Sequence, residues 1–153
     1  MKAEVLRQIP EAENFLRQCE RLTFKQRQTI VKQGDPSDSI YLILEGSVAV
    51  IIDGDDDDAH QEMVVSYLNP GDFFGEMGLF GEEFRTANLV ARAPVEVARI
   101  SYDRFHQVRG NYPEILFVLA TQIGHRLRTT TRKLTDLAFV DVAGRIAQTL
   151  NDL

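Results

Sequence analysis

The sequence has 153 residues, of which 44% are hydrophobic and 26% charged, as expected for a globular chain of one domain and the start of a second. Its formal net charge of −6 differs from the basic balance of most nucleic-acid-binding proteins, so we do not expect this chain alone to bind DNA well. Because it has neither an apolar run of the roughly 18 residues that span a membrane nor a signal-peptide pattern, we expect a cytoplasmic protein.

Residues 1–22 are predicted to form a small helical cap. Their apolar members recur near helical spacing: Leu6, Ile9, Phe15, Cys19 and Leu22. The single cysteine, Cys19, cannot form an internal disulfide, and its apolar flanks favour a buried structural thiol over a reactive one.

Residues 28–101 are predicted to be β structure throughout. Short apolar strands recur about every 8–12 residues with Gly or Pro turns between them, which is typical of sandwiches, barrels and jelly rolls. The corners Gly34-Asp35 and Gly71-Asp72 repeat, as in a roll of two similar windings. Together with the family resemblance given below, this recurrence predicts an α+β fold, a double-stranded β-helix (a jelly-roll-like β-roll) with flanking N-terminal helices and a long C-terminal dimerisation helix.

Helical patterning begins near Ser101, and from Pro113 onward an apolar stripe steps by three or four residues. Its members are Leu116, Leu119, Ile123, Leu127, Thr130, Leu134 and Leu137. Such a stripe gives a helix roughly 36 Å long, and near-heptad steps predict pairing with a second copy in a parallel homodimer. We expect a hinge at Phe139 and Val140, and a new helix over 142–150 capped by Asp141.

Candidate ligand-binding residues gather in segment 73–80 and in residues 85–87. Gly75 and Gly78 allow tight turns, and a short helix there would present free N–H groups to an anion. Arg85 offers a planar fork of donors suited to phosphate, and Glu76 can accept from a sugar hydroxyl. These residue types fit a sugar phosphate, but they also allow Arg85 to pair with Glu76 in a protein without ligand.

These residues resemble the phosphate-binding cassette of cyclic-nucleotide-binding domains. The wider sequence resembles the N-terminal domain of the cyclic-AMP receptor protein type, the catabolite activator / fumarate–nitrate regulator family. The matching segments follow in order through nearly the whole chain: 45–50, 66–69, 71–73, 75–80, 85–87, 96–102, 137–142 and 144–150. The resemblance implies a ligand-sensing domain of a bacterial transcription regulator, with cyclic AMP as its effector and no metal.

The resemblance also implies a role for each matching residue of the roll. Glu76 would bind the ribose 2′-hydroxyl, and Arg85 the cyclic phosphate. The ligand would also meet a group of neighbouring residues: Gly75, Thr86, the backbone N–H groups of Met77 and Ala87, and the lining residues Val50, Val65 and Phe74.

On the long helix, Thr130 and Thr131 match the pair that reaches the base, one from each subunit. Thr130 could instead be a polar residue that sets the register of a dimer seam. Arg126, one turn earlier, could support the same site or be a solvated charge.

The family implies three parts: a cyclic-nucleotide-binding β-roll over 1–110, a dimerisation helix over 111–138, and over 139–153 a hinge and the first helix of a DNA-binding domain otherwise absent from this chain. Ligand would control that helix-turn-helix domain allosterically. DNA would be bound only through it, RNA polymerase is a candidate partner, and no membrane partner is expected.

Three alternatives stay open at this stage. Thr86 stands where Ser is typical, the loop between Phe80 and Arg85 is slightly short, and residues 85–88 also resemble cyclic-GMP-responsive channels and kinases, so cyclic GMP is not excluded. The same fold could also sense a cyclic dinucleotide or act only as a dimerisation module. The pair Thr130-Thr131 favours cyclic AMP.

Two other groups of residues carry weaker signals. Asp53 and residues 55–58 crowd one hairpin tip, which we interpret as a solvated acidic tip, able to meet a basic partner surface, rather than a calcium loop. The histidines His60, His106 and His125 lie on different elements, which does not fit the clustered ligands of a cupin-type metal enzyme. We expect no enzyme.

Overall fold

The computed structural model describes residues 4, 7–54 and 62–151, with residues 139–141 and 151 described by their backbone alone. The chain consists of two compact units, Met1–Val118 and Leu119–Leu153.

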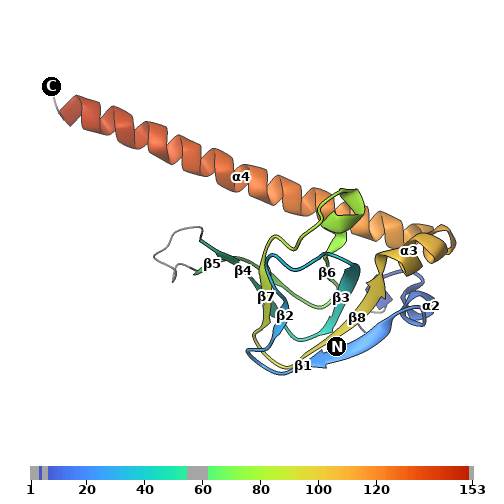
Figure 1. Ribbon diagram of the computed structural model, residues 1–153. Helices are drawn as coiled ribbons and strands as arrows, with labels where there is room; N and C mark the ends of the chain where they lie inside the picture. Colours follow the sequence, from blue (N-terminus) through green and yellow to red (C-terminus); the bar gives the residue numbers. More distant parts are fainter. Residues whose placement is uncertain (1–3, 5–6, 55–61, 152–153) are drawn as a thin grey trace. The chain divides into compact units, whose positions relative to one another are not determined.

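Two four-stranded antiparallel sheets form the first unit (Figure 1). One has the order β1-β8-β3-β6, with bounds Glu20–Phe24, Val95–Ser101, Ser39–Glu45 and Phe73–Phe74. The other has the order β2-β7-β4-β5, with bounds Thr29–Val31, Asn88–Ala91, Val48–Asp53 and Glu62–Leu68. The chain passes repeatedly from one sheet to the other, which confirms the predicted β-roll.

The core between the sheets is apolar and draws on both of them. Its buried members are Tyr41, Ile43, Val48, Leu68, Phe74, Leu89, Ala91, Val95 and Val97. Strand β3 is buried at every position but its last, because it lies between β8 and β6 and both of its faces are covered. A continuous apolar run such as 40–44 suits a strand with two buried faces.

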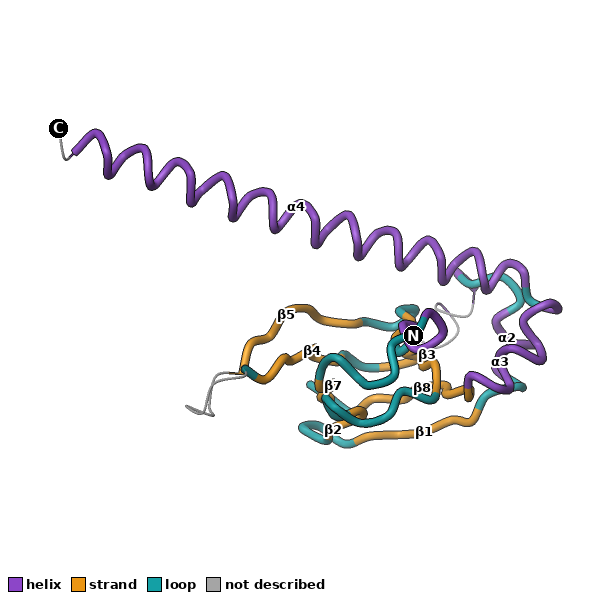
Figure 2. Tube along the Cα trace, turned by 45° about the horizontal axis from the view of Figure 1, so that its top comes forward, coloured by secondary structure: helices purple, strands orange, loops and turns teal. Residues whose placement is uncertain are grey.

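Short helices pack at one end of the roll: α2 (Ala12–Leu16), α3 (Tyr102–Val108) and the 3₁₀ turn η2 (Arg109–Asn111) (Figure 2). Phe15 of α2 meets Phe73, Phe105 and Tyr112 edge to face, with ring centroids 5.6–6.5 Å apart. Ser101 caps α3 by accepting from the backbone N–H of Arg104, so helical structure begins where the sequence predicted.

The prediction of helix throughout residues 1–22 was wrong at its C-terminal end, where residues from Glu20 onward form β1. Leu22 and Phe24 face the core with the exposed Thr23 between them, and pairing with β8 decides the conformation. Cys19 lies between α2 and β1, half-buried, and its Sγ donates to the carbonyl of Phe15 at 3.4 Å. Burial raises the pKa of its thiol to about 12, so at neutral pH it is protonated and inert, as a structural thiol is.

The second unit consists of helix α4 (Pro113–Asn151) from residue 119 onward. Pro113 stands at its first position, where a missing N–H costs nothing. The helix continues through residues 139–141, so the predicted break and the separate helix capped by Asp141 were wrong. No proline or glycine lies between Gly124 and Gly144, and an interior aspartate costs less than about 1 kcal/mol. The proposed domain boundaries remain predictions.

Three further expectations concern the acidic hairpin tip, metal ligands and a membrane-spanning helix. Asp55 to Asp58 and His60, the acidic tip and one histidine, lie outside the described residues. Within the part of the chain that is described, no three His, Cys, Asp or Glu side chains are grouped as metal ligands would be. Nor does any described helix combine the length and apolar character that crossing a membrane requires.

Candidate functional site

Residues 73–87, here called the cassette, begin with strand β6 and turn sharply at Gly75. The 3₁₀ helix η1 (Glu76–Phe80) follows and ends at Gly81. Gly75 has φ +82°, a left-handed conformation that favours glycine. A Cβ there would lie 2.5 Å from the Nη1 of Arg85 and 2.7 Å from the carbonyl oxygen of Ser39. Glycine is therefore required both by the turn and by the close approach of the arginine.

The backbone around Arg85 is fixed to the turn before β3. Arg85 donates its N–H to the carbonyl of Asp35 at 2.7 Å, and its own carbonyl accepts from Gly34 at 2.9 Å. Ser37 donates to the carbonyl of Glu83 at 2.9 Å. These bonds place the arginine beside the beginning of β3.

The guanidinium of Arg85 is buried, with 8% of the residue exposed. It donates to the carbonyl of Ser39 at 2.9 Å and to that of Gly75 at 3.4 Å, and it lies 3.8 Å from an oxygen of Asp38. Its carbon lies 5.6 Å from the ring centroid of Tyr41. A buried cation with several of its donors on carbonyl oxygens is a ready partner for an anion that can offer stronger acceptors.

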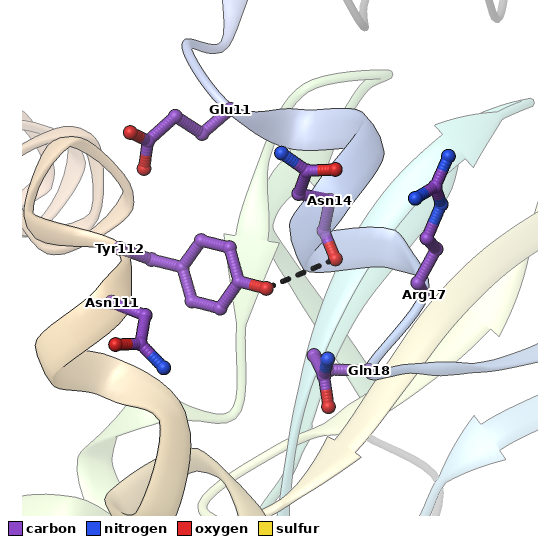
Figure 3. Close-up of a pocket in the computed structure, with 6 residues that line it drawn as sticks. All are labelled: Glu11, Asn14, Arg17, Gln18, Asn111 and Tyr112. Atoms are coloured by element: carbon purple, nitrogen blue, oxygen red, sulfur yellow. Dashed lines mark hydrogen bonds between the residues drawn. The ribbon is translucent and has the colours of Figure 1, made fainter.

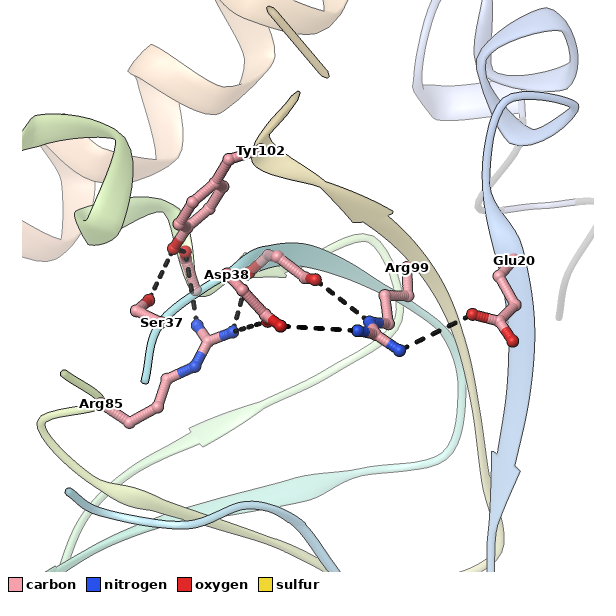
Figure 4. A network of polar contacts seen from close by, with 8 residues as sticks. Glu20, Ser37, Asp38, Arg85, Arg99 and Tyr102 are labelled. Carbon is pink, nitrogen blue, oxygen red and sulfur yellow. Dashed lines mark hydrogen bonds and ion pairs between the residues drawn. The ribbon is translucent and has the colours of Figure 1, made fainter. Parts of the chain in front are cut away.

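Asp38 contacts a second arginine as well (Figure 4), and so does Ser39. Arg99 of β8 donates from Nε to the Ser39 hydroxyl at 3.1 Å, and its Nη2 lies 3.7 Å from Asp38. Its Nη1 lies 3.7 Å from Glu20. Two arginines thus converge on one carboxylate and one serine at the start of β3.

Aromatic rings support this end of the roll. Tyr41 and Phe74 stack with centroids 4.7 Å apart and planes within 2° of parallel. Burial raises the pKa of Tyr41 above its usual value, although Arg99 and Arg85 oppose the shift. The Tyr41 hydroxyl is therefore neutral at physiological pH.

Tyr102, the first residue of α3, forms a hydrogen bond to the backbone of the cassette. Its hydroxyl donates to the carbonyl of Gly75 and lies 2.6 Å from the hydroxyl of Ser37. A Cβ at Gly78 would collide with the same tyrosine. The second glycine of the cassette is thus required by packing.

The structure brings together Gly75 and Arg85, with Glu76 next in sequence and buried. Met77 and Thr86 are exposed, and Ala87 is half-buried. Of the predicted lining residues, Phe74 is in the inner core, Val50 packs against it, and Val65 on β5 is half-buried. The roles of these residues remain predictions.

The other predicted ligand residues, Thr130, Thr131 and Arg126, lie on α4 in the second unit. Both threonines are exposed. Arg126 is half-buried and donates to Gln122 at 3.5 Å.

Sequence reasoning missed Asp38 and Ser39, which contact the guanidinium of Arg85, and Tyr102, which bonds to the Gly75 carbonyl of the cassette. No role was predicted for Asp38, and Tyr102 belongs to the matched segment 96–102 without an assigned role. One signal was available: Ser39 is a polar residue at the start of an apolar run, and a fully buried serine needs a partner.

A separate polar pocket lies between α2 and η2 (Figure 3). It is lined by Glu11, Asn14, Arg17, Gln18, Asn111 and Tyr112. None of the predicted ligand residues lines it, and the Tyr112 hydroxyl donates to the backbone of Asn14 at 3.2 Å across it.

The sequence profile of the cyclic nucleotide-binding domain matches residues 21–112, which span the strands of the roll, the cassette, α3 and η2. The chain belongs to the cyclic nucleotide-binding domain family. Among its relatives is the cAMP-activated global transcriptional regulator Vfr of Pseudomonas aeruginosa, 43% identical over 95% of this chain and 68% of that protein. The cAMP-activated regulator CRP of Escherichia coli is 45% identical over 94% of this chain and 68% of its own length.

Solved structures agree with this assignment. The c-di-GMP-responsive regulator CLP of Xanthomonas campestris has a TM-score of 0.75 and 37% identity, covering 99% of this chain and 72% of that one. The catabolite activator protein of Thermus thermophilus has a TM-score of 0.73 and 29% identity, covering 84% of this chain and 59% of that one. The relatives Vfr, CRP and CLP are transcriptional regulators and not enzymes, as the sequence predicted.

Proposed function

We propose that this chain is the ligand-sensing unit of a transcription regulator and that its roll binds cyclic AMP. The observation that carries the proposal is the buried Arg85 beside the left-handed turn at Gly75. Relatives at 43–45% identity named as cAMP-activated support the choice of nucleotide. A cyclic phosphate offers charged oxygen acceptors, which form stronger bonds to a guanidinium than carbonyl oxygens do.

In this proposal Arg85 binds the phosphate, with Thr86 and the backbone N–H groups of Met77 and Ala87 close by. Glu76 accepts from the ribose hydroxyl, and Val50, Val65 and Phe74 line the sugar and base.

Thr130 and Thr131 would contact the base from α4, with Arg126 in support. Apolar side chains exposed on α4 would meet a second copy in a homodimer: Leu127, Leu134, Leu137, Val142, Ile146 and Leu150. Ligand would then favour one packing of the two helices over another, by its difference in affinity for them, and so control an attached DNA-binding domain.

Calorimetric titration of the purified protein with cyclic AMP, cyclic GMP and cyclic di-GMP tests the proposal, together with light scattering for the oligomeric state. We expect saturable binding of cyclic AMP, tighter than that of the other two, by a dimer. Tighter binding of cyclic di-GMP would instead align the chain with its Xanthomonas relative. Absence of binding to all three would leave a dimerisation module.

Replacing Tyr102 by phenylalanine is expected to weaken cyclic AMP binding by about 2- to 10-fold, because the cassette loses a neutral hydrogen bond at the carbonyl of Gly75. The matched control is Tyr112→Phe, which removes a hydroxyl bonded to Asn14 instead. Calorimetry should show unchanged affinity for this control. Equal losses in both variants would mean that Tyr102 does not act through the cassette.

A further inference from the structure

The ion-pair row consists of Arg85, Asp38, Arg99 and Glu20 in that order (Figure 4). Its three separations are 3.8, 3.7 and 3.7 Å. The two oxygens of Asp38 are divided, one toward each arginine. Positive and negative charges alternate along the row. Each inner residue therefore divides its attraction between two neighbours of opposite charge, and the loss of one neighbour strengthens its interaction with the other.

Strand register places Glu20 beside Arg99 and leads from them across the sheet toward the cassette. On the first sheet Glu20 of β1 pairs with Arg99 of β8, Arg99 pairs with Tyr41 of β3, and Tyr41 pairs with Phe74 of β6. Directly paired residues point to the same face. Phe74 is the residue before Gly75, so this line of directly paired residues crosses the sheet from its outer strand to the cassette.

We infer that Arg99 is a positioning residue for the anion site, an inference that rests on the proposed function. Arg99 attracts the carboxylate of Asp38 and thereby weakens the competition of Asp38 with a phosphate for Arg85. Glu20 partly neutralises Arg99 and opposes this effect. Without Arg99, the carboxylate of Asp38 would interact with Arg85 alone and compete more strongly with the phosphate, so phosphate binding would weaken.

The exposure of the row sets the size of the effect. The Arg85 side chain is 6% exposed, whereas those of Arg99, Asp38 and Glu20 are 35%, 67% and 64% exposed. Solvent and salt screen such exposed pairs. The expected change in affinity is therefore about 2- to 5-fold at low ionic strength and smaller at high salt.

A matched control lies beside the row. Arg21 is the next residue after Glu20, and its Nη1 lies 3.7 Å from Glu96. Adjacent strand residues point to opposite faces, so Arg21→Gln removes the same charge from the same sheet without touching Asp38. Arg99→Lys keeps the charge and should recover most of the affinity.

The experiment is a double-mutant cycle with cyclic AMP, measured by calorimetry at low salt on variants whose melting temperatures match the wild type. We expect R99Q to weaken binding by about 2- to 5-fold and R21Q to have no effect. In a D38N background, R99Q should have no further effect, because the carboxylate through which it acts is gone. E20Q should tighten binding slightly, and E96Q should not.

Two results would overturn the inference while the proposed function stands. One is wild-type affinity in R99Q, and the other is an equal loss in the D38N background, which would mean that only the general field of the charge matters. If the wild type bound only cyclic di-GMP, the same cycle would be run with that phosphodiester. A wild type that bound no nucleotide would overturn the proposed function, and this inference with it.

Discussion

Replacing Arg85 by glutamine is expected to weaken cyclic AMP binding by on the order of 100-fold or more. The guanidinium is buried and is the charged partner proposed for the phosphate. Truncating one member of a buried, hydrogen-bonded charge pair typically costs 2–5 kcal/mol or more, which corresponds to about 30-fold or more in affinity. Calorimetric titration measures the loss directly.

Two variants make this result specific. Arg85→Lys keeps the charge but loses the planar fork, so it should bind more weakly than wild type and more tightly than Arg85→Gln. Arg92→Gln removes an arginine that lies over the ring of Tyr67 at 4.2 Å, and it should retain wild-type affinity. Wild-type affinity in both Arg85 variants, each shown to be folded by circular dichroism, would refute the assignment of the phosphate site.

Replacing Gly75 by alanine is expected to lower the free energy of unfolding of the roll by about 2–5 kcal/mol and to abolish ligand binding. The left-handed conformation costs an alanine about 1–2 kcal/mol. Overlap with the Arg85 side chain and the Ser39 carbonyl adds about 1–3 kcal/mol. Urea unfolding followed by circular dichroism measures the loss of stability.

Gly34 separates these two costs. Its φ of +89° is close to that of Gly75, but a Cβ there would meet nothing within 4 Å. Gly34→Ala should therefore cost only the conformational part, about 1–2 kcal/mol of the free energy of unfolding. If the two alanine variants lost equal stability, the predicted overlap of a Cβ at Gly75 with Arg85 and Ser39 would add nothing to the free energy lost.

The sequence predicted the roll well because strand recurrence and Gly-Asp corners are local signals. It also located the cassette, whose glycines the structure explains by a positive φ at Gly75 and by the contact of Gly78 with Tyr102. The strand β1 was missed because five residues with weak alternation gain their conformation from β8, more than 70 residues later. The continuous helix through 139–141 was missed because a capping residue at 141 was given more weight than the absence of helix breakers.

The surroundings of Arg85 could not be predicted for a related reason. Asp38 and Ser39 precede the arginine by 47 and 46 residues, and Arg99 follows Ser39 by 60. No periodicity links positions so far apart, since only strand register brings them together. Nothing in the sequence around the exposed Asp38 indicates that two arginines share its carboxylate.

The order of the strands has a consequence for synthesis. Strand β3 lies between β8 and β6, and its main neighbour β8 is translated some 50 residues later. A chain emerging from the ribosome N-terminus first therefore carries the apolar run 40–44 without cover until Val95–Ser101 has emerged. Contacts this distant in sequence form late. Under the proposed function, a nucleotide would therefore stabilise only the finished roll, because β3 gains its main neighbour when β8 is in place.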